Sequence, residues 1–164
     1  MSERRQVKTI QGALSSIDAL RVVTSLVGDS GTVIETDILY PYYCFDVDCQ
    51  VPTLVGRKNI SLICLVDAIN GLGATADSFR RKNETVPETS LLSEEINDDV
   101  AAETAHRTVT HCLSKKMRTI ASFDVSLLPR ELIYKRFWIV KSRGIRVMVD
   151  STTGGLCPLK LRAA

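Results

Sequence analysis

Five cysteines and two histidines are the side chains of this 164-residue sequence with the strongest potential for nucleophilic or metal chemistry. A thiolate and an imidazole act as nucleophile and base when they lie together, and both bind zinc. His106 and His111 are five residues apart, a spacing that does not bring two side chains to one face of a helix. Cys44 and Cys49 are also five apart, which puts them on opposite faces of a strand. Because no Cys-x-x-Cys pair occurs, the sequence predicts no metal site and no cofactor.

The surroundings of the cysteines favour packed thiols over reactive ones. Cys112 is expected near the C-terminus of a helix, where the helix dipole opposes a thiolate. The sequence contains no Gly-x-Ser-x-Gly elbow and no phosphate-binding loop. An odd number of cysteines in apolar patterns is typical of free thiols in a reducing compartment. The pattern favours a non-enzymatic protein and leaves an enzyme open as the alternative.

The aspartates are expected to have structural roles. Asp67 and Asp150 each end a predicted strand and are each followed four residues later by a glycine. An aspartate in this position usually accepts hydrogen bonds from the backbone of the turn. Asp46 and Asp48 share one face of a strand, and we expect them at the exposed end of a hairpin. No acid–base role is assigned to any of the four.

The elements that would position these residues are two long strand pairs, each preceded by a helix. Residues 39–49 and 60–68 form the first pair, joined by a wide loop at residues 50–58. Residues 132–140 and 145–149 form the second pair. Apolar residues at three-to-four spacing predict one helix from Thr9 to about Gly28 and another that begins near Ser93 or Asn97 and ends at about Lys116.

Element order therefore predicts an α+β fold made of two tandem repeats, each one helix packed on a small antiparallel β-sheet. Residues 1–8 are expected to be a flexible N-terminus and residues 9–76 the first helix-plus-sheet repeat. Residues 77–92 contain few apolar side chains and are expected to be a linker. Residues 93–164 form the second helix-plus-sheet repeat.

Apolar residues on both faces of the predicted strands indicate that both faces are covered. If one helix covers the face of Cys64 and Val66, the opposite faces remain apolar and aromatic, whereas a solvated face would alternate cleanly. Two explanations stay open: an intramolecular core between the repeats, or a subunit interface. The candidate interface residues are Tyr40, Tyr42, Ile63, Leu65, Tyr134, Arg136, Trp138 and Met148.

A helix followed by a hairpin that ends in Val66-Asp67-Ala68 and Gly71 resembles the PepSY domain. Val149, Asp150, Thr153 and Gly154 repeat the motif. The resemblance covers residues 10–75 and, in outline, residues 96–158. PepSY domains pack an N-terminal helix on an antiparallel sheet and act mostly outside the cytoplasm as inhibitory or regulatory modules. The resemblance therefore implies a non-catalytic binding or regulatory module.

Charge and the N-terminus indicate the kind of partner and the compartment. The formal net charge is +2, with 21 basic and 19 acidic residues well mixed, so no concentrated basic face for nucleic acid is expected. Residues 80–82 and the basic N-terminus are the only features that favour nucleic acid. No apolar stretch resembles a signal peptide or a membrane span. We therefore expect a cytoplasmic protein.

The sequence as a whole favours a non-enzymatic protein-interaction or regulatory module that self-associates or is a small subunit of a larger assembly. Its partner would be another protein or a second copy of the chain. The alternative is a small-molecule-binding or thiol-dependent enzyme domain with a pocket between the two repeats.

Overall fold

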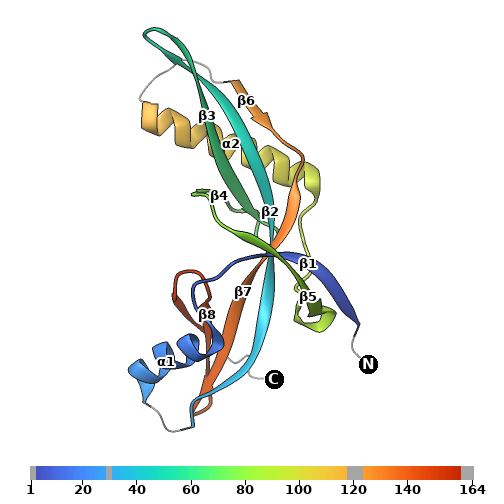
Figure 1. Ribbon diagram of the computed structural model, residues 1–164, viewed down its shortest axis with the longest axis vertical. Coiled ribbons are helices and arrows are strands. Elements are labelled where there is room, and N and C mark those ends of the chain that lie inside the picture. The colour runs from blue at the N-terminus through green and yellow to red at the C-terminus, as the bar shows by residue number, and fades with distance from the viewer. Residues whose placement is uncertain (1–2, 29–30, 118–123, 160–164) are drawn as a thin grey trace. The chain divides into compact units, whose positions relative to one another are not determined.

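A computed structural model describes residues 3–28, 31–117 and 124–159 of the chain (Figure 1). The described chain is mostly β, with 53% in strands and 23% in helices. Its elements run in the order β1 (Arg4–Ile10), α1 (Ser16–Val27), β2 (Val33–Thr53), β3 (Gly56–Asp67), β4 (Gly73–Ala76), β5 (Arg81–Pro87), η1 (Glu88–Ser90), α2 (Asp98–Met117), β6 (Asp124–Leu127), β7 (Glu131–Ser142), β8 (Ile145–Asp150) and β9 (Leu156–Leu159).

The strands of the described residues hydrogen-bond into one mixed sheet of nine strands. Six of them follow the order β4-β3-β2-β7-β1-β5, while β6 pairs with β2, β8 with β7, and β9 with β8. The expected fold of two small antiparallel sheets, one in each half of the sequence, is therefore wrong. The reason is that strands pair across the two halves: β2 is a neighbour of β7, and β1 pairs with β5.

The chain divides into two compact units, and each unit is built from separated segments. The first unit comprises Met1–Tyr40, Arg80–Leu92 and Tyr134–Ala164, and the second comprises Pro41–Phe79 and Ser93–Ile133. The repeats are therefore not tandem. Each half of the sequence supplies strands to both units.

The helices, like the strands, pack against partners from the other half of the sequence. In the first unit, Ala19 and Val23 of α1 pack against Val140 of β7 and Val147 and Val149 of β8. In the second unit, α2 packs on β2 and β3 through a core that contains Ala101, Ala105, Val109 and Leu113 of the helix with Tyr43, Phe45, Cys64 and Val66 of the strands. Each helix thus covers a strand pair from the other half of the sequence. A periodic pattern identifies the apolar face of a helix but not the strand that the face will cover.

The segments expected to be a flexible N-terminus and a linker contain β1 and β5. These strands pair antiparallel in the first unit, from Arg4 opposite Pro87 to Ile10 opposite Arg81. Val7, Ile10 and Val86 are buried, and most of the other side chains are polar and exposed. A strand with so few apolar positions shows no clear alternation, so sequence alone predicts a loop.

The expected wide loop at residues 50–58 is part of a long hairpin. The β2–β3 register runs without interruption from Tyr42 opposite Asp67 to Thr53 opposite Gly56. Leu54 and Val55 form the turn, where Gly56 has φ +126°. The threonine hydroxyl of Thr53 donates to the Gly56 carbonyl at 2.7 Å and closes the turn.

Capping residues explain where the helices begin. Ser15 and Asp18 form a capping box at the start of α1, which therefore begins at Ser16 and not at Thr9. Asn97 accepts a hydrogen bond from the backbone N–H of Val100 at the start of α2. Asp98 and Asp99 lie at the positive end of the α2 dipole. Among the described residues, neither helix is long and apolar enough to cross a membrane.

Candidate functional site

A groove of about 790 Å³ lies beside β3 in the second unit, and it is the concave feature that we take as the candidate site. We call it the β3 groove. β2, β3, β4 and α2 all contribute to its walls. Its lining includes Asp46 and Asp48 of β2, Ile60 to Ile63 of β3, Thr75 and Ala76 of β4, Asp77 and Ser78 after β4, and Cys112, Leu113 and Lys116 of α2.

The strand beside the groove is only partly paired on its free side. β4 pairs with β3 from Ile63 to Val66. From Gly56 to Leu62, β3 pairs only with β2 among the described strands. Along this edge of β3, β4 therefore covers the part from Ile63 to Val66, and the groove lies beside the part that precedes it.

Hydrogen bonds at the base of the hairpin show which backbone groups of β3 face the groove. The N–H of Ala68 donates to Pro41 on the β2 side at 3.1 Å, whereas the N–H of Asp67 donates to Leu72 on the β4 side at 2.8 Å. Backbone groups alternate sides along an antiparallel strand. Ser61 and Asn59 consequently direct their N–H and C=O groups away from β2.

Charge in the groove is mainly negative. Among the described residues, three aspartates and one lysine line it: Asp46, Asp48, Asp77 and Lys116. The hydroxyl of Ser61 donates to Asp48 at 2.9 Å, across the β2–β3 pair. Asp46 and Asp48 are exposed, as expected, but they lie along the hairpin and not at its end, because the hairpin extends further to Leu54 and Val55.

The cysteines of the second unit differ in access to the groove. Cys49 and Cys64 are buried in the core under α2, and burial raises the pKa of both thiols, that of Cys64 to about 11. Cys112 is half-buried and lines the groove, with its sulfur 3.7 Å from the Thr75 hydroxyl. Inert packed thiols were expected; Cys49 and Cys64 are packed, and their lack of reactivity stays a prediction.

Three of the predicted interface residues lie together in the second unit. Tyr42 of β2 and Ile63 and Leu65 of β3 alternate with the core residues Tyr43, Cys64 and Val66, so they share the sheet face that α2 does not cover. All three are half-buried, and Ile63 also lines the β3 groove.

The five predicted interface residues of the first unit do not share one face. Trp138 packs toward α1 with Val149, which lies directly opposite it. Met148 is the neighbour of Val149 and pairs with Ile139, so its side chain lies on the other face. The Tyr40 ring meets Phe137, also on that other face, edge to face at 6.1 Å.

Tyr134, Arg136 and Trp138 lie two positions apart along β7 and therefore share one face of the strand. Tyr134 is buried, with 2% of its surface exposed, so in this structure it offers no surface to a partner.

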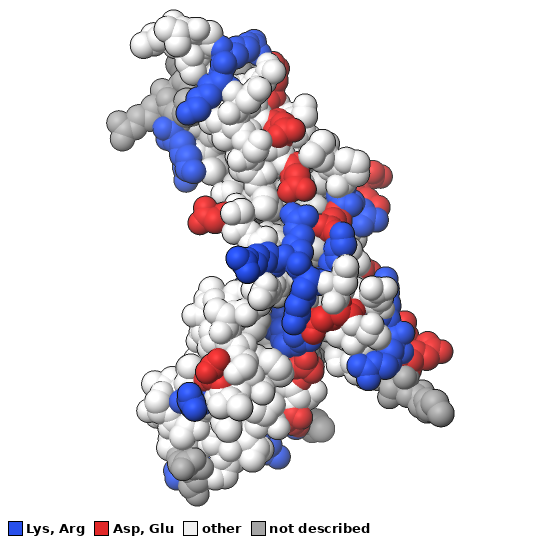
Figure 2. Space-filling model, viewed as in Figure 1, with Lys and Arg blue, Asp and Glu red and all other residues white. Residues whose placement is uncertain are grey.

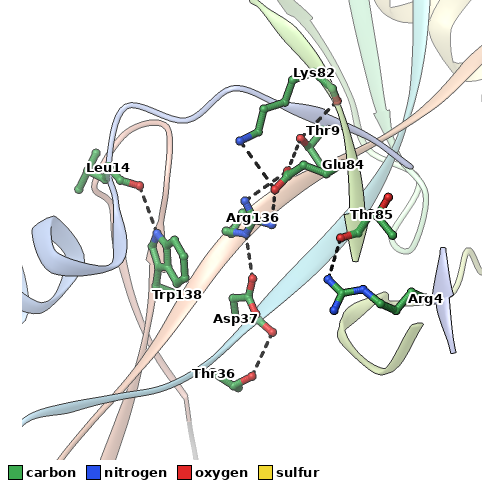
Figure 3. Close-up of polar contacts among 10 residues, drawn as sticks. All are labelled: Arg4, Thr9, Leu14, Thr36, Asp37, Lys82, Glu84, Thr85, Arg136 and Trp138. Atoms are coloured by element: carbon green, nitrogen blue, oxygen red, sulfur yellow. Dashed lines mark hydrogen bonds and ion pairs between the residues drawn. The ribbon is translucent and has the colours of Figure 1, made fainter. Parts of the chain in front are cut away.

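Arg136 of β7 is the centre of a polar cluster that joins four strands of the first unit, β1, β2, β5 and β7 (Figure 3). Its Nε donates to Asp37 of β2 at 2.8 Å, and its Nη2 donates to Glu84 of β5 at 3.1 Å. The buried Thr9 hydroxyl of β1 donates to the same Glu84 carboxylate at 2.6 Å. The guanidinium also lies 5.6 Å from the centre of the Trp138 ring, whose Nε1 donates to the Leu14 carbonyl at 3.2 Å.

Burial and hydrogen bonds act in opposite directions on the ionisation of this cluster. Burial alone would raise the pKa of Glu84, but the hydrogen bonds from Thr9 and Arg136 outweigh it and hold the pKa below its ordinary value of 4.5. Burial would lower the pKa of Arg136, but the carboxylates of Glu84 and Asp37 raise it. The cluster is a network of ion pairs with a structural role. Within it, 82% of the surface of the Arg136 side chain is covered.

The expected role of the two turn aspartates is confirmed. Asp67 accepts the N–H groups of Ile69 and Asn70, at 2.8 and 3.0 Å. Asp150 accepts those of Thr152 and Thr153, at 2.8 and 3.3 Å. Gly71 and Gly154, each four residues later, adopt φ of +79° and +74°.

No metal centre is found in the part of the chain that the structure describes. There, His, Cys, Asp and Glu side chains form no group of three that could hold an ion. His106 and His111 are both exposed on α2.

Sequence reasoning missed the groove residues Thr75, Asp77 and Lys116. The pairing of β4 with β3, beside α2, brings these residues together, and no local sequence pattern indicates that pairing.

Comparison with known proteins finds no matching family model, no similar curated protein and no similar solved structure.

Proposed function

We propose that this protein is a non-enzymatic protein-interaction or regulatory module, either self-associating or a small subunit of a larger assembly. The observation that carries the proposal is the apolar patch of Tyr42, Ile63 and Leu65, on the sheet face that α2 leaves uncovered and next to a groove. Apolar patches beside polar rims are typical of surfaces that bind other proteins.

Light scattering across a concentration series tests the self-associating form. A stable multiple of the 18.1 kDa chain is expected, and Ile63→Asp should reduce it to the monomer mass. Val100→Asp is the matched control, because Val100 is an exposed apolar residue of α2 and lies outside the patch. A multimer that survives Ile63→Asp would contradict the use of this patch.

A photo-crosslinking residue tests the subunit form if the chain is a monomer. Placed at position 63, it should capture one defined protein in cells, whereas the same residue at position 100 should not. If the two positions give the same products, the patch has no specific partner and the proposal fails.

A cytoplasmic location is also proposed. All five cysteines have free thiols, which is typical of proteins in a reducing compartment. The PepSY resemblance stays a proposal as well, supported by the shared hydrogen bonding of the Asp67 and Asp150 turns.

One observation favours the alternative of a thiol-dependent or small-molecule-binding domain: Cys112 lines the β3 groove. A rate of alkylation at Cys112 well above that of the exposed Cys157, near neutral pH, would support this alternative. Equal or slower alkylation of Cys112 would leave the interaction proposal as the better one.

A further inference from the structure

The position beside β3, beyond the end of β4, is the place where another strand would fit. β4 ends at Ala76, opposite Ile63, and the chain then leaves the edge at Asp77. The next residues of β3 toward the hairpin turn have no strand on that side among the described residues. The β3 groove occupies this position, with α2 at its base through Cys112, Leu113 and Lys116.

The backbone of β3 is ready to pair at this position. Ser61 and Asn59 direct their N–H and C=O groups toward the groove, as the hydrogen bonds at Asp67 and Ala68 establish. Unpaired edge groups are a template for an incoming extended chain, which gains main-chain hydrogen bonds when it adds as a strand.

The two sides of the groove differ in chemistry, and this difference matches the alternating side chains of a strand. On the α2 side lie the apolar Ile60, Leu62 and Leu113. On the opposite side lie Asp46 and Asp48 of β2, with Ser61 and Ile63 of β3 beside them. A strand that paired with β3 would point alternate side chains toward these two sides.

Charge selects the class of segment that fits. A lysine or arginine side chain is long enough to reach from the position of the added strand across β3 to Asp48. Asp77, next to the end of β4, adds negative charge to the groove, and Lys116 is the one basic side chain among the described residues that line it. Like charges at close range disfavour an acidic segment, so complementarity favours a basic one.

We infer that the β3 groove binds an extended polypeptide segment that adds to β3 in line with β4, with apolar side chains toward α2 and basic side chains toward Asp48. This inference rests on the proposed function as an interaction module and names the chemistry of its partner. We assign the segment to another protein, on the charge complementarity between a basic chain and the aspartates that line the groove; a dimer of the chain joined at this edge is an opposing outcome of the test.

Fluorescence anisotropy with a labelled short peptide that alternates valine and lysine tests the inference on the full-length protein. The peptide should bind, and a matched peptide that alternates valine and glutamate should bind about tenfold more weakly or not at all. Ser61→Pro removes the N–H that faces the groove without removing a β2 hydrogen bond, and edge strands tolerate proline at such positions. It should weaken binding by about tenfold.

Ser61→Ala is the matched control, because it loses the hydroxyl bond to Asp48 but keeps the backbone N–H. It should bind the lysine peptide like the wild type. If Ser61→Pro does not fold, amide hydrogen exchange on the wild-type protein replaces it: the peptide should slow exchange at Ser61 and Asn59.

Three results would overturn the inference: unchanged binding to a folded Ser61→Pro variant, equal binding of both peptides, or a dimer of the chain that Ser61→Pro disrupts. None of these results uses an Ile63 variant. Ile63 belongs to both the patch and the groove, whereas Ser61 lines only the groove, so loss of peptide binding in Ser61→Pro reports on the groove and leaves the patch to its own test.

Discussion

Arg136 and Glu84 show how single residues hold the strands of the first unit together. The Arg136 guanidinium donates hydrogen bonds to Asp37 of β2 and Glu84 of β5. Glu84 also accepts a hydrogen bond from the Thr9 hydroxyl of β1. Arg136 was expected to be an interface residue from its place among aromatic residues. Glu84 and Asp37 are distant from it in sequence, so no spacing could reveal the ion pair.

The depressed pKa of Glu84 makes this cluster sensitive to acid. Its stabilising effect is fully present above the ordinary pKa of about 4.5 and is lost as pH falls through the lower pKa of the folded state. Glu84→Gln should lower the free energy of unfolding by about 1–3 kcal/mol at pH 7. The difference from wild type should shrink below pH 4.5. Urea denaturation at several pH values measures it.

Glu88→Gln is the control for this prediction, since Glu88 is exposed. A constant difference between Glu84→Gln and wild type down to strongly acidic pH would show that the carboxylate charge is not what stabilises the cluster.

Burial predicts the order in which the thiols react. Cys157 is exposed and Cys112 half-buried, whereas Cys44, Cys49 and Cys64 are buried. A maleimide pulse near neutral pH should label Cys157 first, then Cys112, and the other three only after unfolding. Peptide mass spectrometry gives the order. Rapid labelling of Cys64 in the folded protein would contradict its burial and its raised pKa.

At the scale of elements, local signals identified most helices and strands and failed at pairing. The strand expected at residues 39–49, the apolar spacing of the second helix and the turn after Asp67 all predicted elements close to those observed. The β3 groove could not be predicted, although Ile63 was a candidate residue. It requires that β4 stop at Ala76 while β3 continues and that α2 lie under both, and these are tertiary facts.

Close packing between β4 and α2 gives a prediction at this scale. A Cβ at Gly73 would overlap the Thr108 hydroxyl and press on the side chain of Thr104. Gly73→Ala should therefore destabilise the protein by about 1–3 kcal/mol. Thr108→Ala removes the overlapping hydroxyl, so the double variant should recover most of that loss. Thermal denaturation of the wild type, the two single variants and the double variant measures the coupling between the two positions. Additive effects on stability would show that the two residues are not in contact.

The end of the β2–β3 hairpin is an element with an unusual surface. Leu54 and Val55 are fully exposed, and Arg57 and Lys58 follow them. Figure 2 shows an uncharged end of this hairpin with basic side chains beside it. Arg57 pairs with Asp124 of β6. The exposed tip contributes nothing to the core, so substitutions of Leu54 by polar residues should change stability by less than about 0.5 kcal/mol.

At the scale of the whole molecule, the exchange of segments between the two halves is the dominant property. Residues before and after the β4–β5 connection contribute to both units. A repeat predicted from the element order was reasonable, because the Asp67 and Asp150 turns do have equivalent hydrogen bonds. What the order could not indicate is that α1 would pack on β7 and β8, and α2 on β2 and β3.

Cutting the chain tests this exchange directly. A protease site inserted between the exposed residues Asp77 and Ser78 would yield fragments 1–77 and 78–164. The cleaved protein should elute as one species and keep its circular dichroism spectrum, because neither unit is complete without both fragments. Fragments that separated under native conditions and stayed folded would contradict the exchange. The uncleaved insertion variant is the control.

Because each helix packs on strands from the other half of the sequence, one packing partner is translated well before the other. The apolar face of β2 and β3 is complete once Asp67 has been made, yet the helix that covers it ends only at Met117. At a translation rate of roughly 5–20 residues per second, that face stays exposed for roughly 3–10 s before α2 is complete. Ribosome-bound chains that end near residue 90 should therefore be digested by a protease that released, full-length protein resists. The interval is longer in the first unit, because α1 is complete at Val27 and the strand β8 on which it packs ends only at Asp150.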